Sequence, residues 1–460
     1  MTIPTGSAYL LERAWVGGAV HADVLVEIAD GRFTRVEPAG RVHDLRSEPS
    51  GGKSRFPRIS GETTAPTRLP GLTLPGFANT HSHAFHRALR GRTQRERGTF
   101  WTWREQMYAV AERLDPDGYF TLARAAYREM AAAGMAAVGE FHYLHHQPQG
   151  TPYADPNVMS HALVAAAQEA GIRLALLDTC YLSAGFGEPP QGVQRRFSDG
   201  NVFAWAERSG ARSATDGVRL GAAIHSVRAV PVEAMPAIAE AAAGRPLHAH
   251  VSEQVGENQA CVAAYARTPV EVLLDHGVLG PLTTAVHATH LTEDDVAHLA
   301  ETRTYAGFCP TTERDLGDGI GPSTRLRDAG VRLTLGSDSH AVVDPFEEMR
   351  ALELDERLAT QQRGHWRAAD LLRAATEDGH ASLGWDDAGA IAVGHRADLV
   401  TVDTTSPRTA GTGADEHTAA FAATAADVTQ VVVDGRVVVR QGDCEQIGRE
   451  LDAAIGKVWN

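Results

Sequence analysis

The middle of the chain, residues 71–391, alternates short aliphatic or β-branched runs with alanine-rich stretches of helical character. Several helical stretches end at glycine, a common helix terminator. Strands that alternate with helices build a parallel sheet, and eight of them close most economically into a barrel. The runs expected as strands are 72–81, 136–144, 173–182, 218–226, 245–253, 284–291, 304–310 and 332–339.

An open, doubly wound α/β sheet is the alternative for this alternation. Such a sheet typically carries a GxGxxG turn after its first strand, and the sequence has none there. We therefore predict an α/β fold with a (β/α)8 TIM barrel over residues 71–391.

The two ends of the chain have a different pattern, with short strands and tight turns. Asp30-Gly31 and Asp434-Gly435 each stand between β-branched runs, as in a hairpin. We expect residues 1–70 and 392–460 to pair into one small, discontinuous β-sandwich domain. Within the first part, residues 42–70 are rich in Ser, Pro, Gly and Thr and predict a loop.

Composition excludes several classes of function. The net charge of −15 argues against nucleic-acid binding, which needs clustered positive charge. No apolar run reaches the roughly 18 residues of a membrane span, and the N-terminus lacks the pattern of a signal peptide. The cysteines form no CxxC pair, which predicts reduced, buried thiols in a cytoplasmic protein. They are Cys180, Cys261, Cys309 and Cys444.

Metal-binding residue types recur at the expected C-terminal ends of the strands, where barrel enzymes hold their sites. The first strand ends in His81-Ser82-His83, and residues i and i+2 of a strand point to the same side. His250 ends the fifth strand and Asp338 ends the eighth. Such a set of imidazoles and a carboxylate suits zinc, with iron(II) as the alternative.

Other histidines near these ends leave alternatives open. His248 is a second candidate on the fifth strand, although His250 lies nearer the strand end. His287 ends the sixth strand, and His290 beside it is better explained as a structural histidine. His225 occupies the end of the fourth strand.

The positions of the lysines indicate how many metal ions the site holds. Two-metal sites of this architecture commonly use a carboxylated lysine at the end of the fourth strand. Here Lys53 and Lys457 are the only lysines, and neither lies in the predicted barrel. We therefore expect one divalent ion, bound by His81, His83, His250 and Asp338, beside a reactive water.

The predicted ligands leave two neighbours for proton transfer. A divalent ion lowers the pKa of bound water from about 15.7 toward about 7, and Asp338 can accept its proton. His287 can orient or activate this water. Glu253, three residues after a ligand, can carry protons to the nitrogen of a leaving group.

At this point the sequence resembles the amidohydrolase superfamily, and more closely its formimidoylglutamate deiminases. That family hydrolyses N-formimino-L-glutamate, an intermediate of histidine degradation, to N-formyl-L-glutamate and ammonia. The resemblance implies a small-molecule substrate, and a homodimer is common for this architecture. Its segments are HSHAFHRAL, FWTWREQMY, GEFHYLHH, IHSVRAV, HAHVSEQ, VHATHL and GSDSH.

The resemblance also implies roles residue by residue. It gives the same metal ligands, with Glu253 and His287 as the catalytic pair. Arginines suit the two carboxylates of this substrate because the guanidinium fork binds both oxygens. Many relatives have glutamine at the position of His86, although a histidine there can still donate a hydrogen bond. The implied substrate-binding residues are His86, Arg104, Tyr143, His225 and Arg228.

Two other functions compete with this one. A deaminase of a purine or pyrimidine ring would use the same metal, Glu253 and His287, but would favour aromatic stacking over paired arginines. A non-catalytic scaffold would have lost ligand histidines, and all the predicted ligands are present here.

Overall fold

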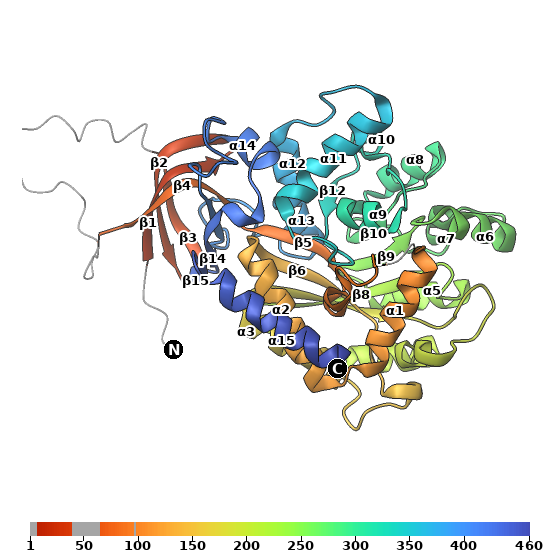
Figure 1. The fold of residues 1–460 in the computed structure, drawn as a ribbon. Coiled ribbons are helices and arrows are strands. Elements are labelled where there is room, and N and C mark those ends of the chain that lie inside the picture. The colour runs from red at the N-terminus through yellow and green to blue at the C-terminus, as the bar shows by residue number, and fades with distance from the viewer. Residues whose placement is uncertain (1–6, 39–64, 96–97) are drawn as a thin grey trace, which may run out of the picture.

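The computed structural model describes residues 7–38, 65–95 and 98–460. These residues form two sheets, one of eight strands and one of seven (Figure 1). The eight-stranded sheet is parallel throughout and carries its strands in chain order, from β5 to β12. This confirms the predicted (β/α)8 barrel with a separate sheet built from both ends of the chain.

The barrel closes between its first and last strands. Ser82 pairs with Asp338, and the amides of Ser337 and Asp338 donate to the carbonyl of His81 at 3.1 and 3.0 Å. The two predicted metal motifs thus lie at the seam. The strands are β5 (Phe77–Ser82), β6 (Met135–His142), β7 (Arg173–Cys180), β8 (Val218–Ser226), β9 (Leu247–Val251), β10 (Thr283–His287), β11 (Tyr305–Phe308) and β12 (Leu333–Leu335).

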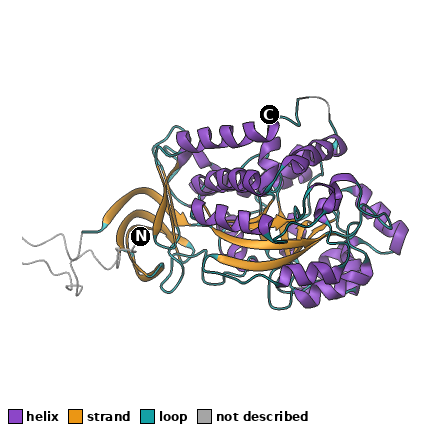
Figure 2. Ribbon diagram, turned by 90° about the horizontal axis from the view of Figure 1, so that it is seen from below, coloured by secondary structure: helices purple, strands orange, loops and turns teal. Residues whose placement is uncertain are grey.

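Helices surround the barrel strands (Figure 2). Their sequences explain their bounds: α3 ends at Gly171 in the left-handed conformation, and Thr268 and Asp344 cap α7 and α11. They are α1 (Phe100–Arg113), α2 (Pro116–Ala132), α3 (Val158–Ala170), α4 (Val202–Gly210), α5 (Met235–Ala241), α6 (Val255–Tyr265), α7 (Pro269–Asp275), α8 (Glu293–Thr302), α9 (Pro310–Leu316), α10 (Ser323–Asp328), α11 (Pro345–Thr360), α12 (Ala368–Ala375), α13 (Glu377–Ser382), α14 (Glu416–Phe421) and α15 (Cys444–Trp459).

The run expected as one strand, residues 72–81, is divided between the two sheets. Strand β4 (Thr67–Pro75) belongs to the seven-stranded sheet, and β5 begins the barrel at Phe77. Gly76 lies between them, where a Cβ atom would meet Ala136 at 2.7 Å and Asp398 at 2.8 Å. The expected loop of residues 42–70 falls mostly outside the described residues, and from Thr67 onward it is strand instead.

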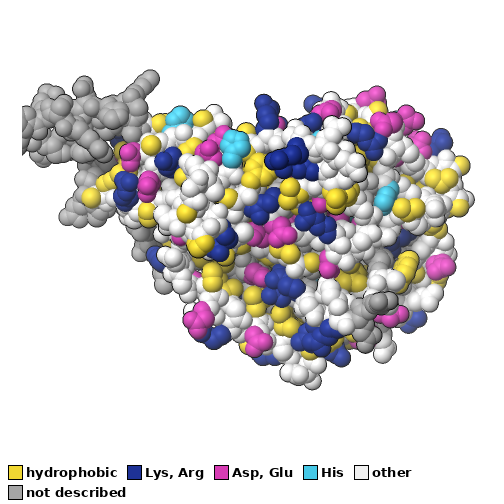
Figure 3. All heavy atoms as spheres, turned by 45° about the horizontal axis from the view of Figure 1, so that its top comes forward, with side chains coloured by type: hydrophobic (Ala, Val, Ile, Leu, Met, Phe, Trp, Pro, Cys, Tyr) yellow, Lys and Arg dark blue, Asp and Glu magenta, His cyan; other side chains and the backbone are white. Residues whose placement is uncertain are grey.

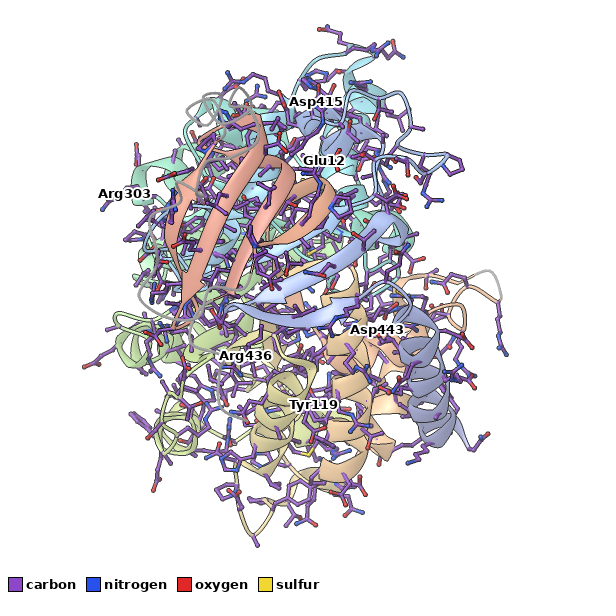
Figure 4. All side chains as sticks on the ribbon, turned by 90° about the vertical axis from the view of Figure 1, so that its left-hand side faces the viewer. Glu12, Tyr119, Arg303, Asp415, Arg436 and Asp443 are labelled. Carbon is purple, nitrogen blue, oxygen red and sulfur yellow. The ribbon has the colours of Figure 1, made fainter. Side chains whose placement is uncertain are left out.

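The seven-stranded sheet joins both ends of the chain (Figure 4). Both predicted hairpins are confirmed, because Ala29 pairs with Arg32 and Val433 pairs with Arg436. The sheet order is β15 (Arg436–Arg440), β14 (Val428–Val433), β13 (Leu399–Val402), β4, β1 (Ser7–Val16), β2 (Ala19–Ala29) and β3 (Arg32–Glu37).

The structure shows the positions of the cysteines and the distribution of surface charge. Cys180, Cys261 and Cys309 are buried free thiols, but Cys444 is exposed at the start of α15, so the prediction of four buried thiols was wrong. Basic and acidic side chains are mixed over the face shown in Figure 3. In the described part of the chain, no helix has the length and apolarity needed to cross a membrane.

A buried ion pair joins the N-terminal end of the barrel to the seven-stranded sheet. Arg173, the first residue of β7, donates to both oxygens of Asp398 at 2.9 and 2.5 Å and to Asp434 at 3.0 Å. The side chains of Arg173 and Asp398 are each 1% exposed. This end of the barrel is therefore closed by the sheet, and the C-terminal ends of the strands are left for a site.

Arg173→Met is expected to lower the free energy of unfolding by about 3–5 kcal/mol, because it leaves the buried Asp398 carboxylate uncompensated. Urea denaturation measures the change. Arg124→Met is the control, since its pair with Glu169 is exposed and should contribute at most about 1 kcal/mol. Equal effects of the two substitutions would contradict a structural role for the buried pair.

Candidate active site

The barrel seam brings the first metal motif against the last. His81 lies near the end of β5, His83 directly follows that strand, and Asp338 follows β12. The Nε2 atoms of His81 and His83 each lie 3.2 Å from Asp338 Oδ1. His250, at the end of β9, completes the group, with its Nε2 atom 3.1 Å from His81 Nε2. We call these four residues the His/Asp cluster.

Backbone carbonyls fix the ring orientation of two cluster histidines. His83 Nδ1 donates to the carbonyl of Phe141 at 2.9 Å, and His250 Nδ1 donates to that of His225 at 2.8 Å. In the neutral rings, the Nε2 lone pairs therefore face the cluster centre. Burial lowers the pKa of His81 to about 3 and that of His250 well below its usual range, which keeps both rings neutral.

The donor set of the cluster fits a divalent cation. Ring nitrogens of His81 and His83 lie beside one carboxylate oxygen of Asp338, a ring nitrogen of His250 lies beside that of His81, and carbonyls behind His83 and His250 hold these two rings in place. Such carbonyl-supported histidines are typical of metal ligands. Although burial alone would raise the pKa of Asp338, the neighbouring His81 and His83 hold it well below its usual range. The residues present therefore fit one divalent ion.

The other histidines at the strand ends take different positions. His250, and not His248, joins the cluster. His290 donates from Nε2 to the carbonyl of Asp318 at 2.8 Å, as expected of a structural histidine. His287 lies close enough to offer a further ligand, because a ring nitrogen lies within 4.8 Å of ligand atoms on His81, His250 and Asp338.

Several non-glycine residues at the strand ends adopt left-handed backbone conformations, and three of them are predicted site residues or the neighbour of one. The φ angles are 54° at Ser252, 70° at His287 and 36° at Asp338. Such conformations cost of order 1–3 kcal/mol each and occur where surrounding structure enforces them, often at functional sites. The strain falls on the predicted site residues and on the neighbour of Glu253.

His287 stands between two carboxylates. Its Nε2 atom lies 3.9 Å from Glu253 Oε1, and its Nδ1 atom lies 3.4 Å from Glu313 Oε1. Although burial alone would lower the pKa of His287, Glu253, Glu313 and Asp338 raise it to about 10. Sequence reasoning missed Glu313. The available signal was an acidic residue in the first turn of the helix after the seventh strand.

The five residues predicted to bind substrate line one cavity together with Glu253, His287 and Asp338. The cavity measures about 540 Å³ including its open mouth, which suits a small molecule. His86 Nε2 and the Tyr143 hydroxyl are hydrogen-bonded at 3.0 Å. The prediction omitted other residues of the wall, chiefly Trp103, Tyr108, Tyr181, Phe197 and Leu316.

Charge is distributed unevenly around this cavity. Arg104 and Arg228 lie on its wall, and both oppose the burial-driven rise in the pKa of Tyr181, which reaches about 12. Burial and then the charge of Arg228 lower the pKa of His225 well below its usual range. Glu253 and Asp338, in contrast, raise the pKa of His287 through their negative charges. The cavity therefore has a cationic part and an anionic part.

Comparison with known proteins agrees with this geometry. A formimidoylglutamate deiminase of Pseudomonas aeruginosa is 38% identical over 422 residues, which cover 88% of this chain and 93% of that protein. A 5-methylthioadenosine/S-adenosylhomocysteine deaminase of Pelotomaculum thermopropionicum is 29% identical over 377 residues, covering 80% and 81%.

Solved structures show the same architecture. An amidohydrolase from Brucella melitensis superposes with a TM-score of 0.86 at 30% identity, covering 99% of this chain and all of that one. An adenosine deaminase from Xanthomonas campestris with bound zinc has a TM-score of 0.80 at 22% identity, covering 99% of each chain, and shares the fold. Residues 72–438 match the amidohydrolase family. The chain therefore belongs to the amidohydrolase family.

Proposed function

We propose that this chain catalyses the metal-dependent hydrolysis of N-formimino-L-glutamate to N-formyl-L-glutamate and ammonia. The observation that carries the proposal is the cavity with arginines on one part of its wall and carboxylates on another. The substrate has the matching charges, two carboxylates and a cationic formimino group. The P. aeruginosa relative, a formimidoylglutamate deiminase, supports the same assignment.

The proposed metal ligands are His81, His83, His250 and Asp338. Zinc is the first candidate and iron(II) the second, because both accept imidazole and carboxylate ligands. The ion would polarise a water molecule and lower its pKa toward about 7. Elemental analysis of the purified protein should give close to one equivalent per chain. Two tightly bound equivalents would contradict the single-ion site.

The surrounding side chains would move the protons of the reaction. Asp338 accepts the proton of the attacking water, and His287 orients that water. The water oxygen bonds to the formimino carbon, and Glu253 delivers a proton to the departing nitrogen. The C–N bond then breaks while the new hydroxyl group gives its remaining hydrogen to the Glu253 carboxylate that has just lost one, so that ammonia is released and the formyl carbonyl is left. The 3.9 Å separation of His287 Nε2 and Glu253 Oε1 lets both groups reach one reacting centre.

We propose that the remaining predicted residues hold the substrate. Arg104 and Arg228 pair with its carboxylates, while His86, Tyr143 and His225 contact it from the neighbouring wall. Although burial alone would lower the pKa of Arg228, the nearby Glu257 and Glu253 raise it. The guanidinium therefore stays charged. We propose that the enzyme acts in histidine degradation and is located in the cytoplasm. We also propose that it is a homodimer, which sedimentation equilibrium tests.

A ring deaminase is the second candidate function, because aromatic side chains occupy much of the cavity wall. Trp103, Tyr108, Tyr143, Tyr181 and Phe197 could stack on a planar ring. The deaminases of adenine derivatives at about 29% identity belong to this class. Ammonia release from N-formimino-L-glutamate, compared with release from guanine and from formiminoglycine, separates the two functions.

Arg228→Met and Arg104→Met should each lower kcat/KM for N-formimino-L-glutamate by about 10- to 150-fold. This is the effect of losing one charge-assisted hydrogen bond, roughly 1.5–3 kcal/mol. A contact formed equally in substrate and transition state changes mainly KM, and one that also positions the formimino carbon lowers kcat as well. Metal content should not change.

The control for these variants is an arginine away from the cavity, Arg124→Met. The wild type should also discriminate strongly against formiminoglycine, which lacks the second carboxylate. If both cavity variants and formiminoglycine perform nearly as well as the reference, the substrate assignment fails and the ring deaminase becomes the better candidate.

A further inference from the structure

A linked group of polar side chains occupies the arginine part of the cavity wall. Arg104 Nε donates to the Tyr108 hydroxyl at 2.6 Å. The side-chain amide of Gln194 donates to the hydroxyls of Tyr108 and Tyr181, each at 3.0 Å. Arg104 also lies close enough to Tyr181 to oppose the rise in its pKa. Tyr108 and Tyr181 line the cavity, and we call them the tyrosine pair.

The orientation of Gln194 is fixed by its own backbone neighbourhood. Its Oε1 atom accepts the amide hydrogen of Gln191 at 3.0 Å, at the start of the 3₁₀ helix η5 (Gly192–Phe197). The amide nitrogen must therefore face the tyrosines, and its two hydrogens serve the two hydroxyls. Gln194 is buried, so water does not compete for these hydrogen bonds.

The direction of these hydrogen bonds determines what the hydroxyls can still do. The phenol oxygen of Tyr108 accepts N–H donors from Arg104 and Gln194, and the phenol oxygen of Tyr181 accepts one from Gln194. The hydrogen of each hydroxyl must then point elsewhere, and within the described ranges no residue accepts it. Burial raises the pKa of Tyr181 to about 12, so its hydroxyl keeps the hydrogen at neutral pH. The wall thus presents two O–H donors beside a guanidinium.

Two hydroxyl hydrogens without an acceptor, beside a guanidinium, form a site for a carboxylate, because an anion accepts from both hydroxyls and pairs with the cation. Arg104 stacks on Trp101 with 5.7 Å between the guanidinium carbon and the ring centroid, and Trp101 is 65% exposed. Arg228 instead lies within electrostatic reach of Glu253, beside the reacting centre. The Arg104 group therefore faces the mouth and meets the carboxylate farther from the formimino carbon.

We propose that Tyr108 and Tyr181 donate their hydroxyl hydrogens to the side-chain carboxylate of the substrate beside Arg104, and that Gln194 is the positioning residue that turns both hydroxyls into the cavity. This inference rests on the proposed function. It makes the tyrosine pair a determinant of specificity for an acyclic dicarboxylate, whereas the ring-deaminase alternative would use the same rings only for stacking.

The test compares two substrates in Tyr108→Phe and Tyr181→Phe. The first substrate is N-formimino-L-glutamate, and the second is N-formimino-L-norvaline, in which a methyl group replaces the side-chain carboxylate. Each variant should lose about 10- to 100-fold in kcat/KM on the first substrate, mainly through KM. On the second substrate, each should match the wild type within about 3-fold. Tyr305→Phe, which removes a buried hydroxyl outside the cavity, should change neither value.

Gln194→Leu tests the positioning role separately. It should raise KM for N-formimino-L-glutamate in the wild-type background but add little to the Tyr108→Phe, Tyr181→Phe double variant, because it acts through those hydroxyls. Metal content and melting temperature verify folding of each variant.

The outcomes separate the two proposals. If the tyrosine variants lose equally on both substrates, or lose nothing on N-formimino-L-glutamate, the inference is overturned while the proposed function stands. A wild type without activity on N-formimino-L-glutamate overturns the proposed function, and this inference with it.

Discussion

Glu253→Gln is expected to lower kcat by at least about 10²-fold, and up to about 10⁴-fold, the usual range for general acid–base catalysis. Glutamine keeps the shape and hydrogen-bonding reach of the side chain but cannot take up and deliver a proton. Glu253 lies in the cavity wall and 3.9 Å from His287 Nε2, where a proton for the leaving nitrogen is needed. KM should change little if the binding contacts lie elsewhere.

The measurement is steady-state ammonia release, with the metal content of each preparation determined in parallel. Glu240→Gln is the matched control, because it makes the same substitution at an exposed position of helix α5. A kcat within about 3-fold of the wild type would show that Glu253 does not carry the proton. Loss of metal in Glu253→Gln would instead assign the residue to the metal site.

Much of this arrangement could be predicted from the sequence because barrels impose a simple rule. Parallel strands place their C-terminal ends on one rim, so residue types at the ends of strands reveal the site. His81, His250 and Asp338 are far apart in the sequence, yet their ring nitrogens and carboxylate meet at 3.1 and 3.2 Å. The hairpins could be predicted for a similar reason, since Asp-Gly suits their turns.

The remaining features depend on tertiary packing, which strand patterns do not encode. Residues 72–81 are apolar enough for one strand, but the chain crosses between two sheets at Gly76, where no side chain fits. Tyr108 lies on helix α1 and Gln194 on the 3₁₀ helix η5, both outside the barrel strands, so their spacing carries no periodic signal. Glu313 becomes recognisable only once His287 is found beside it.

Two histidines compete for the fourth ligand position of the predicted metal site. His83 and His287 both approach the other ligands. His83 Nε2 lies 3.2 Å from Asp338 Oδ1, and its Nδ1 atom is held by the carbonyl of Phe141. His287 points Nδ1 at a carboxylate, Glu313, and Nε2 toward another, Glu253. A histidine held between two carboxylates is better suited to bind and release a proton than to serve as a neutral ligand.

His287→Asn is therefore expected to keep its metal and to lose at least about 10²-fold in kcat, because water loses the group that orients it. The paired variant His83→Asn should lose metal, since it removes a carbonyl-supported ligand nitrogen. Elemental analysis and ammonia release, measured on the same preparations, distinguish the two histidines. If His287→Asn loses the ion while His83→Asn retains it, the ligand assignment is reversed. Glu253 would then be left without its histidine partner in proton transfer.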